Sequence, residues 1–233
     1  MELTGVLEND RIGRRYWSVR RATAPLHRGW LNVDRQGLAN VPTHGGVIFA
    51  ANHLSFIDSV LLMYSCRRQV TFLGKAEYLT MPATRRLFPA AGMIPVDRSG
   101  KSVGRSLGLA IDRLKAGEIV GIFPEGTRSR DGLLHEGHVG VAHLALKSGA
   151  PIVPVGIIGS DAAMPADSLL PRRSPITVRF GAPIDLGRWT GCRPTGAVKR
   201  EITDEVMDTI AVLTGQPRER DAAANPPTPV FAA

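Results

Sequence analysis

A histidine and an aspartate five residues apart are the side chains of this sequence that first suggest chemistry. They are His53 and Asp58, in the segment Asn-His-Leu-Ser-Phe-Ile-Asp at 52–58. A neutral imidazole can take a proton from an alcohol while its other nitrogen donates to a carboxylate that fixes the tautomer. Ser55 and Asp58 also have the spacing of a capping box, in which Asp58 would serve the N-terminus of a helix. Both roles of Asp58 are open at this point.

A second segment, at 123–130, combines a turn with hydroxyl groups and cations. Its sequence is Phe-Pro-Glu-Gly-Thr-Arg-Ser-Arg. Gly126 permits a tight turn that exposes backbone N–H groups, and Arg128 and Arg130 offer planar cations suited to phosphate. The segment therefore predicts an oxyanion cradle, and the alternative is a solvated turn with a basic edge.

Both segments directly follow short apolar runs of the kind that form buried strands. We expect strands at 47–51, 70–73, 93–96, 119–123, 152–157 and 176–180, and helices at 56–63, 103–116, 138–148 and 198–213. Strands that alternate with helices predict an α/β fold, with a largely parallel mixed sheet and helices on both faces. Ligands bind outside the carboxyl ends of such strands, and both segments lie at such ends.

The 233 residues fit a single domain with a short appendage at each end. We expect a basic amphipathic segment at 1–28, a central domain at 29–214 and a disordered tail at 215–233. The tail prediction rests on composition, because the chain collects prolines and alanines there.

The charge of the chain predicts an anionic partner. Its net charge is +8 and its pI is about 10.2. Residues 11–35 hold seven arginines and one acid, interleaved with aromatic residues such as Trp17 and Trp30. Such a segment can lie against the anionic head groups of a membrane, and a solvated basic face is the alternative. Nucleic acid is not an expected partner, because the cluster matches no nucleic-acid-binding pattern.

Hydropathy predicts a peripheral protein on the cytoplasmic face of the cell membrane. No stretch approaches the ~20 apolar residues of a transmembrane span, and residues 1–10 lack the apolar core of a signal peptide. Cys66 and Cys192 are the only cysteines. They suit neither a zinc cluster nor a disulfide framework, so we expect free thiols.

Three further segments belong, with the two motifs above, to a set of motifs in a fixed order along the chain. Gly-Lys-Ala-Glu at 74–77 contains Lys75, Ile-Pro-Val-Asp-Arg at 94–98 ends in Arg98, and Val153 precedes a proline. Taken alone, the Asp-Arg pair at 97–98 is more often a surface ion pair than a site. Together with the motifs at 52–58 and 123–129, these segments resemble the 1-acylglycerol-3-phosphate acyltransferases. The resemblance extends from about residue 29 to residue 186.

The resemblance implies a glycerol-3-phosphate acyltransferase-like fold, with the acyltransferase domain at 29–214. It implies that His53 deprotonates the acceptor hydroxyl and that Asp58 orients His53. It further implies that the acceptor phosphate is bound by Lys75, Arg98, Glu125, Gly126, Thr127 and Arg128.

The implied reaction moves a fatty acyl group from acyl-CoA, or from acyl carrier protein, to glycerol-3-phosphate or lysophosphatidate. Its product would serve phosphatidic acid and phospholipid biosynthesis. We expect no cofactor, metal or covalent enzyme intermediate, because a thioester is already activated. Another lysophospholipid or a glycosylated phosphoinositide stays open as the acceptor. An acyl-thioester hydrolase, in which His53 activates water, is the alternative from a different class.

Overall fold

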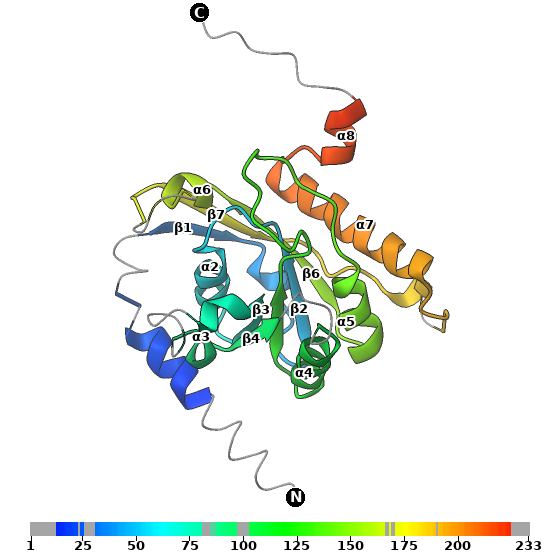
Figure 1. The fold of residues 1–233 in the computed structure, drawn as a ribbon, viewed down its shortest axis with the longest axis horizontal. Coiled ribbons are helices and arrows are strands. Elements are labelled where there is room, and N and C mark those ends of the chain that lie inside the picture. Colours follow the sequence, from blue (N-terminus) through cyan, green and yellow to red (C-terminus); the bar gives the residue numbers. More distant parts are fainter. Residues whose placement is uncertain are drawn as a thin grey trace, which may run out of the picture.

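The computed structural model describes residues 13–22, 24–25, 31–80, 85, 87–96, 103–165, 168, 171–189 and 191–224. A seven-stranded sheet forms its centre, in the order β1-β7-β6-β2-β5-β3-β4 (Figure 1). The strands are β1 (Asn32–Gln36), β2 (Val47–Ala51), β3 (Val70–Lys75), β4 (Met93–Val96), β5 (Ile119–Ile122), β6 (Ile152–Ile158) and β7 (Pro175–Phe180).

The sheet is largely parallel, as the sequence predicted. The five strands β6, β2, β5, β3 and β4 all run in the same direction. At the other edge β7 is antiparallel to β6, and β1 is parallel to β7. Because β2 lies directly between β6 and β5, the loops that follow these three strands meet at one end of the sheet.

Helices cover both faces of the sheet. They are α2 (Asp58–Ser65), α3 (Leu87–Ala90), α4 (Val103–Lys115), α5 (Gly140–Ser148), α6 (Ser160–Ala163), α7 (Gly196–Thr214) and α8 (Glu219–Ala224). Short 3-10 turns lie at η1 (Leu38–Asn40), η2 (Ala76–Leu79) and η3 (Gly187–Trp189). Figure 1 shows α4, α5 and α7 on one face of the sheet and α2 and α3 on the other.

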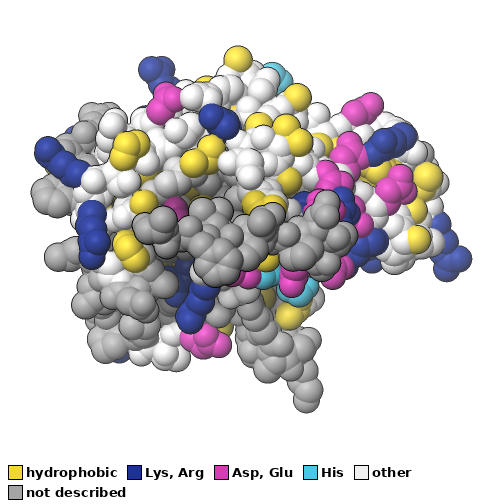
Figure 2. Space-filling view, turned by 90° about the horizontal axis from the view of Figure 1, so that it is seen from above, with side chains coloured by type: hydrophobic (Ala, Val, Ile, Leu, Met, Phe, Trp, Pro, Cys, Tyr) yellow, Lys and Arg dark blue, Asp and Glu magenta, His cyan; other side chains and the backbone are white. Residues whose placement is uncertain are grey.

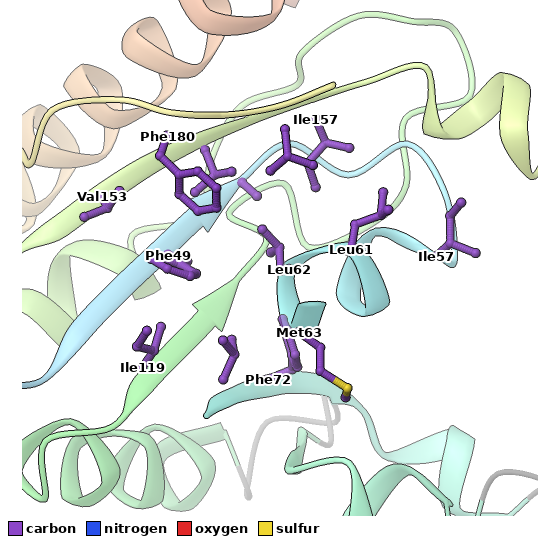
Figure 3. Packing of buried hydrophobic residues seen from close by; sticks show 14 of the residues in the cluster. Phe49, Ile57, Leu61, Leu62, Met63, Phe72, Ile119, Val153, Ile157 and Phe180 are labelled. Atoms are coloured by element: carbon purple, nitrogen blue, oxygen red, sulfur yellow. The ribbon is translucent and has the colours of Figure 1, made fainter. Parts of the chain in front are cut away.

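The core therefore has two halves, one on each face of the sheet. Side chains alternate along β2, so Phe49 joins the half that contains α2, whereas Ile48 joins the half that contains α4, α5 and α7. Figure 3 shows the first half, where Phe49, Leu62 and Phe72 pack together. Burial on both faces explains why the central strands are continuous apolar runs.

The helix at 13–22, within the predicted basic segment 1–28, contributes a residue to the core. Residues 13–22 are helical, and Tyr16 is fully buried. The Tyr16 hydroxyl accepts from the backbone N–H of Val70 (3.2 Å) and donates to the carbonyl of Met63 (3.5 Å). Burial raises the pKa of Tyr16 to about 12. This aromatic residue attaches the helix to α2 and β3.

The C-terminal segment is also more ordered than predicted, since residues 215–224 pack on the domain. The backbone N–H of Leu134 donates to Pro217 O (2.9 Å), and that of Glu219 donates to Leu134 O (3.0 Å). Arg218 is only 4% exposed. Composition alone predicted a disordered tail because these partners lie far away in the sequence. Residues 225–233 fall outside the described part.

Candidate active site

The two motifs meet at the carboxyl end of the sheet. The loop after β2 carries His53, and the neighbouring loop after β5 carries the segment 123–130. They are joined directly, because the backbone N–H of Ser129 donates to the carbonyl of His53 (2.8 Å).

His53 and Asp58 form a hydrogen-bonded pair. His53 Nδ1 lies 2.8 Å from Asp58 Oδ2. The same oxygen accepts from the backbone N–H groups of Leu54 and Ser55, each at 2.8 Å. Because Asp58 Oδ2 accepts from two backbone N–H groups, it is also the acceptor in the bond to His53, and Nδ1 is the donor. In the neutral ring the lone pair is therefore on Nε2. The ring is therefore set up as a proton acceptor.

Asp58 both orients the histidine and caps its own loop. Its carboxylate accepts from Ser55 N–H, which is one of the two bonds of a capping box. The reciprocal bond is replaced, because the backbone N–H of Asp58 donates to the carbonyl of Ser55 (3.2 Å), and the Ser55 hydroxyl donates to Met164 O (2.6 Å). Asp58 is fully buried, so one side chain supports both the loop and the imidazole.

Phe123 supports the histidine ring from one side. The two rings are stacked, with centroids 4.1 Å apart and planes 15° from parallel. The side chain of His53 is 18% exposed. Stacking on Phe123 and the bond to Asp58 together restrict the ring to one orientation. Sequence reasoning recognised Phe123 only as the end of a strand.

Glu125 connects two loops through backbone hydrogen bonds, and its predicted role in phosphate binding stays a prediction. It is only 5% exposed, and it does not line the cavity described below. Its Oε1 accepts from the backbone N–H of His53 (2.9 Å), and its Oε2 accepts from that of His135 (3.2 Å). Burial raises the pKa of Glu125, and the two N–H donors oppose that rise. A carboxylate would also repel a phosphate.

Asn52 fixes the histidine loop to β6, and sequence reasoning did not assign it this role. It is fully buried. Its Nδ2 donates to Ile157 O (2.8 Å), and its Oδ1 accepts from Ile157 N–H (2.7 Å). Its position next to His53 in the motif was the available signal, but the partner lies 105 residues further along the chain.

A cavity of about 220 Å³ opens beside His53. Its lining includes His53, Gly126, Thr127, Arg128 and Arg130. Its remaining wall is mostly apolar and includes Phe56, Val60, Met63, Phe72, Leu73, Phe88, Ala91, Phe123 and Met93. The structure thus places Gly126, Thr127 and Arg128 at the cavity, together with Arg130, which the sequence assigned to the same cradle. A cavity with a proton acceptor, cations and an apolar wall suits a substrate that is both anionic and lipidic.

Two glycines shape the apolar wall of this cavity. A methyl group at Gly121 would lie 2.6 Å from Cε1 of Phe72, and one at Gly74 would lie 2.5 Å from Sδ of Met93. Phe72 and Met93 both line the cavity. The absence of side chains at these two strand positions therefore lets larger side chains occupy the wall.

The remaining predicted residues cannot be placed in the site. Lys75 ends β3 and pairs in register with Val96 of β4, but its side chain is outside the described part. Arg98 lies outside the described residues altogether. Their predicted contacts to phosphate stay predictions.

The described residues contain no group of three His, Cys, Asp or Glu side chains that could hold a metal ion. Cys66 is half-buried and Cys192 is exposed, and both are free thiols. Burial raises the pKa of the Cys66 thiol, so this thiol is a weak nucleophile at neutral pH.

Fold and site together define an α/β protein with a histidine–aspartate pair beside a cationic loop. Residues 32–158, more than half of the chain, match the family described as Acyltransferase. The chain belongs to this family.

Individual relatives carry a more specific name. Proteins named 1-acyl-sn-glycerol-3-phosphate acyltransferase are similar to this chain in Limnanthes douglasii (35% identical; 61% of this chain, 52% of that protein) and Cocos nucifera (33%; 61% and 47%). Another in Borreliella burgdorferi is 32% identical over 54% of this chain and 50% of that protein. The chain spans about half the length of these relatives.

A solved structure has the same fold. It is the 1-acyl-sn-glycerophosphate acyltransferase PlsC of Thermotoga maritima, with a TM-score of 0.65 and 24% identity. The match covers 87% of this chain and 79% of that one. The glycerol-3-phosphate acyltransferase-like fold implied by the motifs is therefore confirmed.

Proposed function

We propose that this protein transfers a fatty acyl group from acyl-CoA or acyl carrier protein to the hydroxyl of lysophosphatidate or glycerol-3-phosphate. The single observation that carries the proposal is the cavity. Its lining combines the His53 ring, Arg128 and Arg130 with a larger number of apolar side chains. The similarity to the named relatives in plants and bacteria supports the same reaction.

The chemistry follows from the orientation of His53. Nε2 takes the proton of the acceptor hydroxyl as its oxygen attacks the thioester carbonyl carbon. An ester C–O bond forms, the C–S bond breaks, and the proton passes from the imidazolium to the leaving thiolate. Asp58 stabilises the imidazolium in between. General-base assistance of this kind contributes about 10²–10⁴ in rate.

The acceptor phosphate binds at the cationic loop in this proposal. Gly126 has φ = +68°, which lets the backbone turn between Glu125 and Thr127. Arg128 is half-buried and Arg130 is exposed at the same cavity. Guanidinium groups bind phosphate oxygens through paired N–H groups, so they hold the acceptor in place for attack. The cavity is smaller than the about 300–1,000 Å³ of usual ligand sites, so both substrates extend beyond it.

A product assay tests the proposal. The purified full chain is incubated with radiolabelled acyl-CoA and, separately, glycerol-3-phosphate, each lysophosphatidate isomer and monoacylglycerol. We expect acylation of a phosphate-bearing acceptor and little acylation of monoacylglycerol. Free fatty acid as the only product would instead indicate a hydrolase. Equal rates with and without the phosphate would remove the role of the cationic loop.

We further propose that the N-terminal helix binds an anionic membrane surface. On residues 13–22, Arg14, Arg15 and Arg21 are exposed, and Trp17 is 41% exposed. Arginine beside an interfacial tryptophan is the usual arrangement at head groups. None of the helices in the described ranges has the length and apolar character of a bilayer span, so the proposed contact is with the surface.

Liposome sedimentation tests the membrane proposal. Deletion of 1–28 is unsuitable, because it would remove the core residue Tyr16. The combined substitution Arg14→Ala, Arg15→Ala and Trp17→Ala keeps Tyr16 and should weaken binding to phosphatidylglycerol vesicles. The control replaces Arg105, an exposed arginine on α4, with alanine. Undiminished binding of the triple variant would contradict the proposal.

A further inference from the structure

The C-terminal segment 215–219 contacts both loops of the active site. Gln216 lies between them. Its Oε1 accepts from Nδ2 of Asn52 (2.7 Å), and its Nε2 donates to Gly132 O (3.1 Å). Asn52 immediately precedes His53, and Gly132 follows the cationic loop. Figure 1 shows the long loop after β5 lying beside the start of α8.

The hydrogen bond between Asn52 and Gln216 follows from the donors and acceptors around the Asn52 amide. The backbone of Ile157 donates through its N–H and accepts through its carbonyl, so it fixes which end of the Asn52 amide is Nδ2. One N–H of Nδ2 is used by Ile157 O, and the other needs an acceptor because Asn52 is fully buried. Gln216 Oε1 supplies it. Residue 216 therefore completes the hydrogen bonding of the residue next to His53.

A second route connects the same segment to His53. Leu134 exchanges backbone bonds with Pro217 and Glu219, which hold the 132–135 loop in place. The backbone N–H of His135 in this loop donates to Glu125 Oε2, and Glu125 Oε1 accepts from His53 N–H. This route ends at the backbone N–H of His53, and the first ends at the side chain of Asn52, one residue earlier.

The segment is itself anchored to α7. Arg218 is only 4% exposed, and its guanidinium lies 2.6 Å from Asp208 Oδ1 and 3.8 Å from Asp204 Oδ1. Arg220 reaches the same Asp208 oxygen at 2.5 Å. Figure 2 shows acidic and basic side chains gathered together on the side of the molecule that carries α7 and α8. An anchored segment can transmit rigidity to the loops that it contacts.

We propose that residues 215–219 form a C-terminal brace and that Gln216 is a positioning residue for His53. The brace keeps the histidine loop and the cationic loop at a fixed separation, so that a bound acceptor hydroxyl meets Nε2 of His53. The inference rests on the proposed acyl transfer for its kinetic consequence. Its structural consequence, restraint of the two loops, is independent of that function.

The test compares Gln216→Leu with the matched control Gln36→Leu in the full chain. Leucine has nearly the size of glutamine but makes no hydrogen bonds. Gln36 also donates once and accepts once, to Asp34 and from Arg179, but it lies on β1 away from the site. Both variants are measured for melting temperature, for kcat, for the KM of acceptor and donor, and for amide hydrogen exchange.

We expect Gln216→Leu to lower kcat by about tenfold or more, as misplacement of a reacting group does, while both KM values stay within about twofold. Amide exchange should accelerate in peptides covering 52–57 and 129–135. The control should change neither. Unchanged exchange in Gln216→Leu would overturn the brace, even if the wild type proved inactive. An active wild type and an equally active Gln216→Leu would overturn the positioning role. An inactive wild type with faster exchange would contradict the proposed function and leave the brace supported.

Discussion

The loops after β2 and β5 lie side by side, but they are stabilised in different ways. The loop after β2 is organised around one buried carboxylate, because Asp58 accepts from three groups of its own segment, including His53. The loop after β5 is held by contacts to other segments, through Glu125 to His53 and through Leu134 to the C-terminal brace. The first loop therefore restrains the His53 ring, and the second places its arginines at the cavity.

The largest expected effect comes from removing the group that the first loop holds. His53→Ala should lower kcat by about 10²–10⁴, since the general base is lost, while the fold is retained. The control His44→Ala replaces an exposed histidine at the opposite end of β2 and should leave kcat unchanged. Substantial turnover by folded His53→Ala, measured by product formation, would remove His53 from this role.

Arg128→Ala tests the ligand-binding role of the second loop. Loss of a charge-assisted hydrogen bond costs about 1.5–3 kcal/mol, so the KM of the acceptor should rise by roughly tenfold to a hundredfold. We expect a much smaller change in the KM of acyl-CoA. Arg105→Ala serves as the control. An unchanged acceptor KM in steady-state assays would mean that the phosphate binds elsewhere.

Glu125→Gln tests whether Glu125 connects the loops or binds the acceptor. A glutamine has one acceptor oxygen for two backbone N–H groups, so one buried N–H loses its partner at a cost of about 1–3 kcal/mol. We expect a lower melting temperature and a kcat reduced by about tenfold, with the acceptor KM nearly unchanged. Glu118→Gln, at the opposite end of β5, is the control. A selective rise in acceptor KM would restore the phosphate-binding interpretation.

The smallest expected effect concerns the pH dependence of the contact between the second loop and the brace. His135 lies 3.0 Å from Glu219 and 3.1 Å from Asp131. Its pKa is raised, first by the hydrogen bond to Glu219 and then by Asp131. Because the folded pKa exceeds the unfolded value of about 6.5, the stabilisation is full below that value and is lost as the pH rises through the folded pKa.

Melting temperatures of wild type and Glu219→Gln should therefore differ most near pH 6 and converge at alkaline pH. We expect a difference of about 2 °C or less, because the pair is partly exposed. Glu136→Gln removes an exposed pair with Arg200, which does not titrate in this range, and is the control. A difference that grew with pH would contradict the assigned ion pair.

Local patterns predicted most of the sheet, but one edge strand was missed. The runs at β2, β5 and β6 are buried on both faces, so they are apolar without interruption. β1 has the sequence Asn-Val-Asp-Arg-Gln and alternates between exposed and half-buried positions. As an edge strand that pairs only with β7, it lacks the apolar signal and was not predicted as a strand.

The site was predictable where its residues are close in sequence. His53 and Asp58 are five residues apart, and Gly126, Thr127 and Arg128 are contiguous. Asn52 and Gln216 are separated by 164 residues, and no local pattern links an amide in a motif to an amide beyond a helix. The hydrogen bonds of Glu125 to the backbone of His53 and His135 were not predictable, because a motif does not show which way a side chain faces.

Gly121 bears on how this family could diversify. Its missing side chain gives Phe72 its place in the cavity wall, and Phe72 takes no part in the hydrogen bonds of His53 to Asp58 and Glu125. A single added methyl group there would displace the ring and reshape the space available to a lipid. Under the proposed function, selectivity for the lipid and proton transfer are thus assigned to separate residues. Over evolutionary time, one can drift by single substitutions while the other stays intact.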